Sequence, residues 1–190
     1  MKALDDEALA RRARGGDERA FAALVERYQG PAFNFAYRLL GNYDDACDAA
    51  QQGFVQLFGA LPDLDLSRPI RPWLFRTIRN RCIDALRQRR TVSLSTAGED
   101  GEGQSVSLGE HLADPGPLPD DLAERADVQQ LLAAAIARLP PRYREVVALR
   151  YTTDLTFGEL AEVLAVPENT AKIHFHRAKA LLRVALRDLM

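Results

Sequence analysis

The chain has 190 residues, of which 47% are hydrophobic and 27% are charged, and its net charge is −2. This composition is that of a soluble globular protein with room for one ordinary domain or two small ones. No uninterrupted apolar run approaches the roughly 18 residues of a membrane span. Membrane insertion is therefore excluded, and we expect a cytoplasmic protein.

The small net charge hides a strongly uneven distribution along the chain. The charge balance is −2 over residues 1–60, +5 over 61–90, −7 over 91–125 and +2 over 126–190. Cations are thus concentrated in one segment where a polyanion could bind, while a separate acidic segment cancels them in the total.

The first ninety residues read as a block of helices. Gly15-Gly16 ends a short helix that starts near Leu4, and Asp17 is a plausible N-cap for the next helix. We expect Gly30-Pro31 to break that second helix and to start a third, which ends near Gly41. Asp44 and Asp45 suit the N-terminus of a further helix, and a long helix follows from Ile70 to Arg90.

The remaining residues divide into a linker and a second helical block. Residues 91–124 have four glycines in their first part, then Pro115, Pro117 and Pro119, and little periodic apolar content, which is typical of a linker. Beyond it we expect helices at about 125–138, 141–151, 156–164 and 168–188. The fold class predicted is all-α, with domains at 1–90 and 125–190 and the linker between them.

The last two helices have the form of a helix-turn-helix. Thr156 and Glu159 have the spacing of a capping box, and a short turn over residues 165–167 leads into a basic final helix. Within that helix, His174 and His176 lie about 200° apart around the axis, so they cannot chelate one metal ion. We predict no metal site and no cofactor.

The polar face of the final helix has two interpretations. Charged faces of amphipathic helices usually face water, but the N-terminal half of the second helix of a helix-turn-helix meets base edges in the major groove. The candidate DNA-binding residues on this helix are Asn169, Thr170, Lys172, Ile173, His176, Arg177 and Lys179. His174 receives no firm role. The two cysteines, Cys47 and Cys82, are interpreted as small buried apolar side chains.

Four stretches together resemble extracytoplasmic-function (ECF) RNA polymerase sigma factors of the sigma-70 family. They are FAALVERYQGPAFNFAYRLLGNYDDACDAAQQGFVQLF, RPWLFRTIRNRCIDALRQRR, LPPRYREVVALRY and LTFGELAEVLAVPENTAKIHFHRAKALLR. The first two are similar to region 2 of the family, and the last two are similar to region 4. The resemblance covers most of the chain.

The resemblance implies a promoter-recognition subunit with two DNA-binding faces and one polymerase-binding face. Region 4 would read the minus-35 duplex. The long helix from Ile70 and the loop before it would capture the melted minus-10 strand, with Trp73 either in the core or stacked on a base. The minus-10 candidates are Arg68, Arg71, Arg76, Arg79, Asn80, Arg87 and Arg90, and the polymerase-binding candidates are Asp48, Gln51, Gln52 and Phe54.

The partners that the resemblance implies are core RNA polymerase, promoter DNA and an anti-sigma factor. The chain departs from the family pattern at Gln51-Gln52, where an acidic Gln-Glu pair is usual, and at Ala165, where the turn usually has glycine. The sequence has neither a Gly-rich phosphate loop nor a Ser/His/Asp set, so it does not suggest an enzyme. The alternative is a helix-turn-helix regulator that acts without polymerase.

Overall fold

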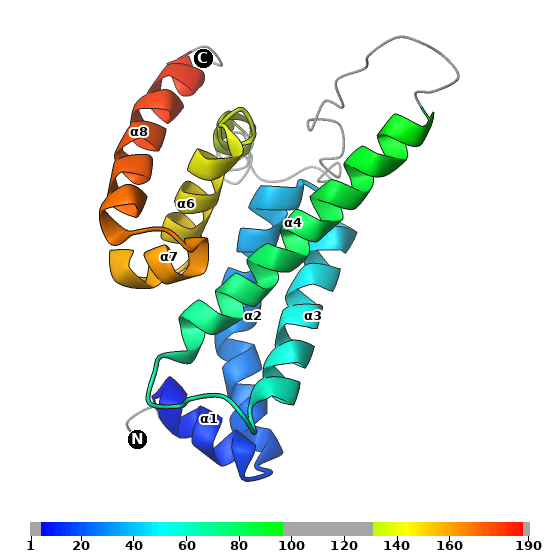
Figure 1. Cartoon of the computed structure of the whole chain (residues 1–190), viewed down its shortest axis with the longest axis vertical. Helices are drawn as coiled ribbons and strands as arrows, with labels where there is room; N and C mark the ends of the chain where they lie inside the picture. The colour runs from blue at the N-terminus through cyan, green and yellow to red at the C-terminus, as the bar shows by residue number, and fades with distance from the viewer. Residues whose placement is uncertain (1–4, 97–130, 188–190) are drawn as a thin grey trace, which may run out of the picture.

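The structure, a computed structural model, describes residues 5–96 and 131–187, and every regular element in these two ranges is a helix (Figure 1). The predicted all-α class is therefore confirmed. Residues 131–137 form a helical segment that begins the second block. The other helices are α1 (Asp6–Arg14), α2 (Glu18–Leu40), α3 (Tyr43–Ala60), α4 (Ile70–Thr96), α6 (Pro141–Thr152), α7 (Phe157–Leu164) and α8 (Glu168–Arg187).

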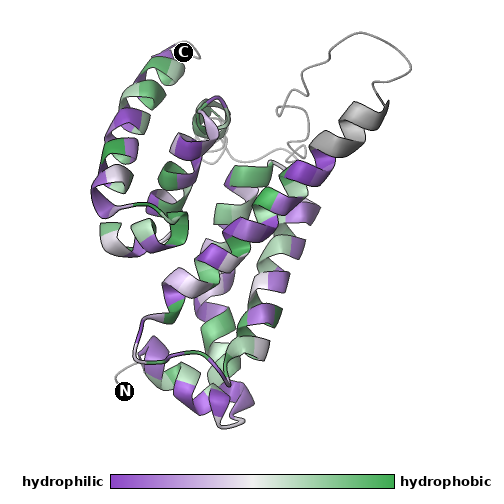
Figure 2. Ribbon diagram, in the orientation of Figure 1, coloured by the Kyte–Doolittle hydropathy of each residue, from purple (hydrophilic) through white to green (hydrophobic). Residues whose placement is uncertain are grey.

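The core of the first block lies where α2, α3 and α4 meet. Phe35, Leu57, Leu74 and Ile78 are almost completely buried there. Gly53 allows α3 and α4 to approach closely, because a Cβ at this position would lie 2.5 Å from Cγ1 of Ile78. Figure 2 shows hydrophobic and hydrophilic residues alternating around these helices, as expected when each helix buries one face.

The predicted break at Gly30-Pro31 is wrong, because α2 runs without interruption from Glu18 to Leu40. Proline inside a helix removes one backbone hydrogen bond and clashes with the preceding turn. Packing on both sides of Pro31 outweighs this cost, since Leu24 before it and Phe35 after it are fully buried. The helix N-cap predicted at Asp17 is confirmed: its carboxylate accepts from the backbone N–H groups of Arg19 and Ala20.

The long helix of the first block also extends beyond its predicted end at Arg90. α4 continues to Thr96, into the segment assigned to the linker. The remainder of the predicted linker, residues 97–124, lies outside the described residues, as do residues 125–130 of the helix predicted there. The charged stretch Arg87 to Arg90 has no helix-breaking residue after it until Gly98, which accounts for the longer helix.

The second block has the predicted helix-turn-helix, and its first helix begins with a complete capping box. The Thr156 side chain accepts from the Glu159 backbone N–H, while Oε2 of Glu159 accepts from the Thr156 backbone N–H at 2.8 Å. The turn that follows places Ala165 in the left-handed region, with φ 55° and ψ 46°. Among the described residues it is the one non-glycine residue with positive φ.

Replacing this alanine by glycine should stabilise the protein. A residue with a Cβ is destabilised by about 1–2 kcal/mol in the left-handed region, and glycine removes this strain. Glycine also makes the unfolded chain more flexible, which offsets part of the stabilisation. We expect Ala165→Gly to raise the free energy of unfolding by roughly 0.5–1 kcal/mol, or a few degrees in Tm. Thermal and urea unfolding monitored by circular dichroism measure it. An unchanged or lower stability would contradict the strain assigned to Ala165.

The two blocks pack against each other in the described structure. α6 lies against α2, and α7 lies against α4 (Figure 1). The main cluster of buried apolar side chains is continuous across both blocks, from Phe35 and Ile78 in the first to Ile136 and Leu160 in the second. A second, smaller cluster lies under α1 and includes Leu24.

No helix within the described ranges has the length and hydropathy needed to cross a membrane.

Both cysteines are free. Cys82 is buried as predicted, and its burial raises the pKa of the thiol to about 12. It is therefore protonated at neutral pH and packs as a small apolar group. Cys47 is half-buried, at the edge of a groove between α2 and α3.

Candidate functional site

The outer face of α8 presents the residues predicted to meet duplex DNA. Asn169, Ile173, His176 and Arg177 are exposed, and half of the Ile173 side chain is accessible. Lys172 is half-buried and pairs with Glu168 one turn earlier, with 2.6 Å between Nζ and Oε1. Because both side chains are about half exposed, the pair holds Lys172 only weakly and leaves it available for exchange with a phosphate or a base.

Two other candidates on α8 are half-buried. Lys179 is half-buried with its Nζ 5.7 Å from the centre of the Phe175 ring, and it lines a cleft on the side of α6. Thr170 is also half-buried. The structure thus brings four of the seven predicted residues together on the exposed face, with Lys172 beside them.

His174 acquires a structural position that the sequence left unassigned. Its ring meets the buried ring of Tyr143 edge to face, with centroids 5.6 Å apart and planes at 89°. This geometry is favourable for aromatic pairs. His176, by contrast, is exposed. The two histidines therefore lie on different sides of α8, as their spacing predicted.

The loop before α4 and the first turns of α4 enclose a cleft of about 200 Å³. Its lining comes from the loop, from α4 and from one side chain of α7, and consists of Leu64, Asp65, Arg68, Pro69, Pro72, Trp73, Arg76 and Glu162. Arg14 of α1 holds the loop in place, because its Nε donates to the Leu61 carbonyl at 2.7 Å and its Nη2 donates to the Leu64 carbonyl. This loop therefore borders a cavity.

The groups in this cleft combine cations, an aromatic ring and a carboxylate. Arg68 and Arg76 are exposed, whereas Trp73 is half-buried, lines the cleft and also packs against the core. The Asp65 carboxylate accepts from the Ser67 hydroxyl at 2.7 Å and from its backbone N–H at 3.0 Å. These bonds lower the pKa of Asp65, so it stays ionised and acts purely as an acceptor.

The other predicted minus-10 residues are distributed along α4. Asn80 and Arg87 are exposed on the helix surface, and the side chain of Arg90 lies outside the described residues. Arg71 and Arg79 are half-buried and form ion pairs with Glu159 and Glu145 of the second block. No local pattern indicates these pairs, because the partners are 88 and 66 residues apart in the chain.

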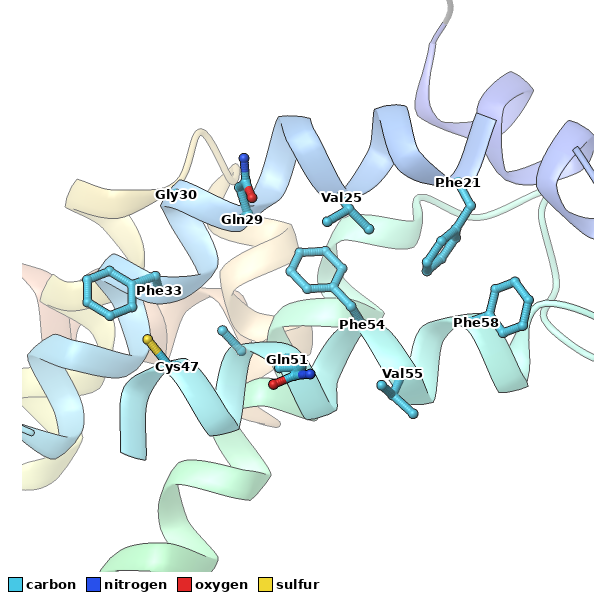
Figure 3. A pocket seen from close by; sticks show the side chains of 11 residues that line it. Phe21, Val25, Gln29, Gly30, Phe33, Cys47, Gln51, Phe54, Val55 and Phe58 are labelled. Carbon is cyan, nitrogen blue, oxygen red and sulfur yellow. The ribbon is translucent and has the colours of Figure 1, made fainter. Parts of the chain in front are cut away.

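A large apolar groove runs between α2 and α3 (Figure 3). Its volume is about 730 Å³, and Phe54 and Gln51 line it, whereas Asp48 and Gln52 are exposed outside the lining. Sequence reasoning missed most of its wall, which comprises Phe21, Val25, Gln29, Gly30, Phe33, Cys47, Ala50, Val55 and Phe58. The four-residue spacing of the wall residues on α2 is the signal that could have revealed it.

Large apolar side chains are exposed to solvent along this groove. Val55 is 65% exposed and Phe58 is 56% exposed. The Phe58 ring packs edge to face against the Phe21 ring, with 5.0 Å between the ring centroids. A contiguous exposed apolar strip of this kind marks an interaction surface. The helical folding of α2 and α3 thus creates a surface suited to a helical partner.

Comparison with known proteins assigns both blocks to one family. The sigma-70 region 2 model matches residues 24–92, and the sigma-70 region 4 model matches residues 129–182. The ECF RNA polymerase sigma factor SigW of Bacillus subtilis is 32% identical over 92% of this chain and 92% of its own length. RNA polymerase sigma factor CnrH of Cupriavidus metallidurans is also 32% identical, over 95% of this chain and 94% of its own.

Solved structures show the same arrangement of helices. CnrH in complex with the cytosolic domain of CnrY superposes with a TM-score of 0.70 at 25% identity, covering 96% of this chain and 97% of that one. The sigma factor RpoE of Bartonella quintana, solved with the anti-sigma factor NepR, matches in fold with a TM-score of 0.67 at 20% identity, over 88% of this chain and 96% of that one.

The chain belongs to the sigma-70 family of RNA polymerase sigma factors, in its ECF group. It is therefore a two-domain transcription initiation factor that binds RNA polymerase and directs it to promoters. A regulator that acts without polymerase, the alternative considered from the sequence, is not favoured.

Proposed function

We propose that the cleft beside α4 captures an unstacked base of the melted minus-10 strand. The observation that carries this proposal is the convergence of Trp73, Arg68 and Arg76 on one small cleft with the ionised Asp65. A strand taken out of a duplex needs an aromatic face for stacking and cations along its backbone. The Asp65 carboxylate can accept from a base amino group, while Asn80 and Arg87 continue the polar surface along α4.

We also propose that the exposed face of α8 reads the minus-35 duplex. Its exposed amide, imidazole and cationic groups suit base edges and phosphates, and Ile173 can pack on a thymine methyl group. The N-terminal half of α8 is the part that a helix-turn-helix inserts into the major groove. Ala165 and Pro167 set the direction of α8 relative to α7, and so the angle at which this face is presented.

In vitro transcription tests the function as a whole. Core polymerase, a promoter library and the purified chain are combined, and the start sites that depend on the added chain are sequenced. We expect initiation at a defined promoter class only when the chain is present. If initiation is the same with and without a folded chain, promoter direction by this protein is refuted.

The apolar groove between α2 and α3 is the proposed polymerase contact. It contains Phe54 and Gln51, and Asp48 and Gln52 are exposed beside it. A negative charge at Val55 would be buried on binding, so we expect Val55→Glu to weaken core polymerase binding by roughly thirtyfold. The affinity is measured by fluorescence anisotropy.

A matched control separates the groove from general charge effects. Ala22→Glu introduces the same group at an exposed position of α2 that does not line the groove, and it should bind polymerase normally. Equal losses in both variants would place the polymerase contact elsewhere.

We further propose that an anti-sigma factor binds this chain. The support is that two structures of similar fold were solved with a bound partner: the cytosolic domain of CnrY for CnrH, and the anti-sigma factor NepR for the Bartonella quintana factor. A candidate captured on the immobilised chain should inhibit the transcription assay when added in equimolar amount. A captured protein that leaves transcription unchanged would not be this partner.

A further inference from the structure

The loop that carries Asp65 follows directly on the end of α3, where backbone carbonyl groups need hydrogen-bond donors. The last turn of a helix leaves carbonyl oxygens without partners inside that helix. Here α3 ends at Ala60, and the carbonyl of the next residue, Leu61, accepts from Arg14 Nε at 2.7 Å. Nη2 of the same guanidinium group donates to the Leu64 carbonyl. One side chain of α1 therefore joins the two ends of the turn from Leu61 to Leu64.

The residue directly after this turn is Asp65, the acceptor in the cleft beside α4. Its carboxylate accepts from Ser67 in two hydrogen bonds, of 2.7 and 3.0 Å, so the side chain moves with the loop backbone. Trp73, by contrast, belongs to α4 and packs against the main cluster of buried apolar side chains. The position of the acceptor relative to the aromatic ring therefore depends on how firmly Arg14 holds the loop.

α1 is a firm support for this contact. Asp6 in its first turn accepts from the Tyr28 hydroxyl and from the Arg27 guanidinium of α2, and the Asp6 side chain is only 13% exposed. The apolar side of α1 contributes to the smaller buried cluster, which the loop residue Leu61 also joins. These polar contacts and this packing fix the place from which Arg14 reaches the loop.

The two hydrogen bonds to the loop require an arginine. A planar guanidinium group donates from several nitrogens in fixed directions, whereas the ammonium group of lysine is a point charge on a flexible chain. Arg14 uses Nε for one carbonyl and Nη2 for the other. The sigma-70 region 2 model matches from residue 24 onward, so Arg14 lies before the matched segment. The family match therefore does not account for this contact.

We propose that Arg14 is a positioning residue for base selection at the minus-10 element. It fixes the loop so that the Asp65 carboxylate can accept from the exocyclic amino group of the captured base while Trp73 stacks on that base. Thymine lacks such an amino group, so a well-placed carboxylate discriminates against it. A loosely held loop spreads the carboxylate over several positions and weakens this discrimination. The inference rests on the proposed capture of a base in the cleft.

The test uses holoenzyme reconstituted from core polymerase and the full chain, with a promoter library randomised across the minus-10 element. Sequencing of the transcripts gives the base preference at each position, and Asp65→Asn identifies the captured position as the one where the preference changes. We expect Arg14→Lys to reduce the discrimination against thymine at this position roughly fivefold, because the selectivity of about one hydrogen bond is lost. Preferences at the other minus-10 positions should not change, and circular dichroism should show a folded variant.

Arg11→Lys is the matched control, because Arg11 is exposed on the same helix and its Nε donates to the Glu7 carbonyl within α1. It should leave every preference unchanged. An even loss of initiation at all sequences in Arg14→Lys would overturn the proposal, because a merely structural contact gives that result. If Asp65→Asn changes one preference and Arg14→Lys does not, the role of Arg14 alone is refuted. If Asp65→Asn changes none, the capture of a base in the cleft is refuted as well.

Discussion

A double variant Arg68→Ala, Arg76→Ala should open promoters roughly thirtyfold less well than the native chain. Both guanidinium groups are exposed at the cleft beside α4, and within the described part of the chain the ion pairs from α4 to the second block are made by Arg71 and Arg79 instead. Each lost contact between arginine and a phosphate should cost about 1 kcal/mol at an exposed site. Permanganate reactivity of the melted strand in reconstituted holoenzyme measures the opened fraction.

Salt dependence distinguishes phosphate contacts from a folding defect. Two lost single-strand phosphate contacts should reduce the slope of log affinity against log salt by about 1.4. The control Arg11→Ala, Arg19→Ala removes two exposed arginines of α1 and α2 that do not line the cleft. If the control loses as much opening, or if the slope does not change, the cleft does not hold the strand.

The second large effect is expected at the face of α8. Lys172→Ala, His176→Ala should weaken binding to the minus-35 duplex by about tenfold or more, because a base or phosphate contact of this kind contributes about 1–3 kcal/mol. Binding to core polymerase should not change. Both affinities can be measured by anisotropy with a labelled duplex and with labelled core. A parallel loss of core affinity would mean that this face contacts polymerase.

His174 provides a matched control on the same helix. His174→Phe keeps an aromatic ring against Tyr143 and leaves the exposed face of α8 intact, so it should bind the duplex normally. His174→Ala removes the ring contact and should lower thermal stability. Loss of duplex binding in a stably folded His174→Phe variant would show that position 174 also reads DNA.

Local patterns predicted the elements that depend on nearby residues. The Asp17 cap and the capping box at Thr156 both depend on residues within a single helical turn of each other. Such features are set by the helix repeat itself, so they can be read before any fold is known. The helix break predicted at Gly30-Pro31 was wrong because it, too, rested on local preference alone. Burial of side chains on both sides of Pro31 outweighs that preference.

The arrangement of the candidate site is harder to predict from the sequence. The groove between α2 and α3 requires two helices to be placed side by side, and the cleft beside α4 requires Arg14 of α1 to hold a loop almost fifty residues away. The sequence identified Arg68, Trp73 and Arg76 as candidates but could not tell which cations would be exposed. That depends on which side chains of distant segments reach them.

By itself, the sequence determined an all-α chain with two helical blocks, a helix-turn-helix at its end and a basic segment beside an acidic one, together with the family to which these belong. Hydrophobic periodicity, caps and charge clusters are local properties, and they are sufficient for those conclusions. Only the tertiary structure decided that Arg71 and Arg79 pair with Glu159 and Glu145, that His174 packs on Tyr143, and that an apolar groove is left open. These contacts join residues far apart in the chain, so their geometry is set by the packing of whole helices.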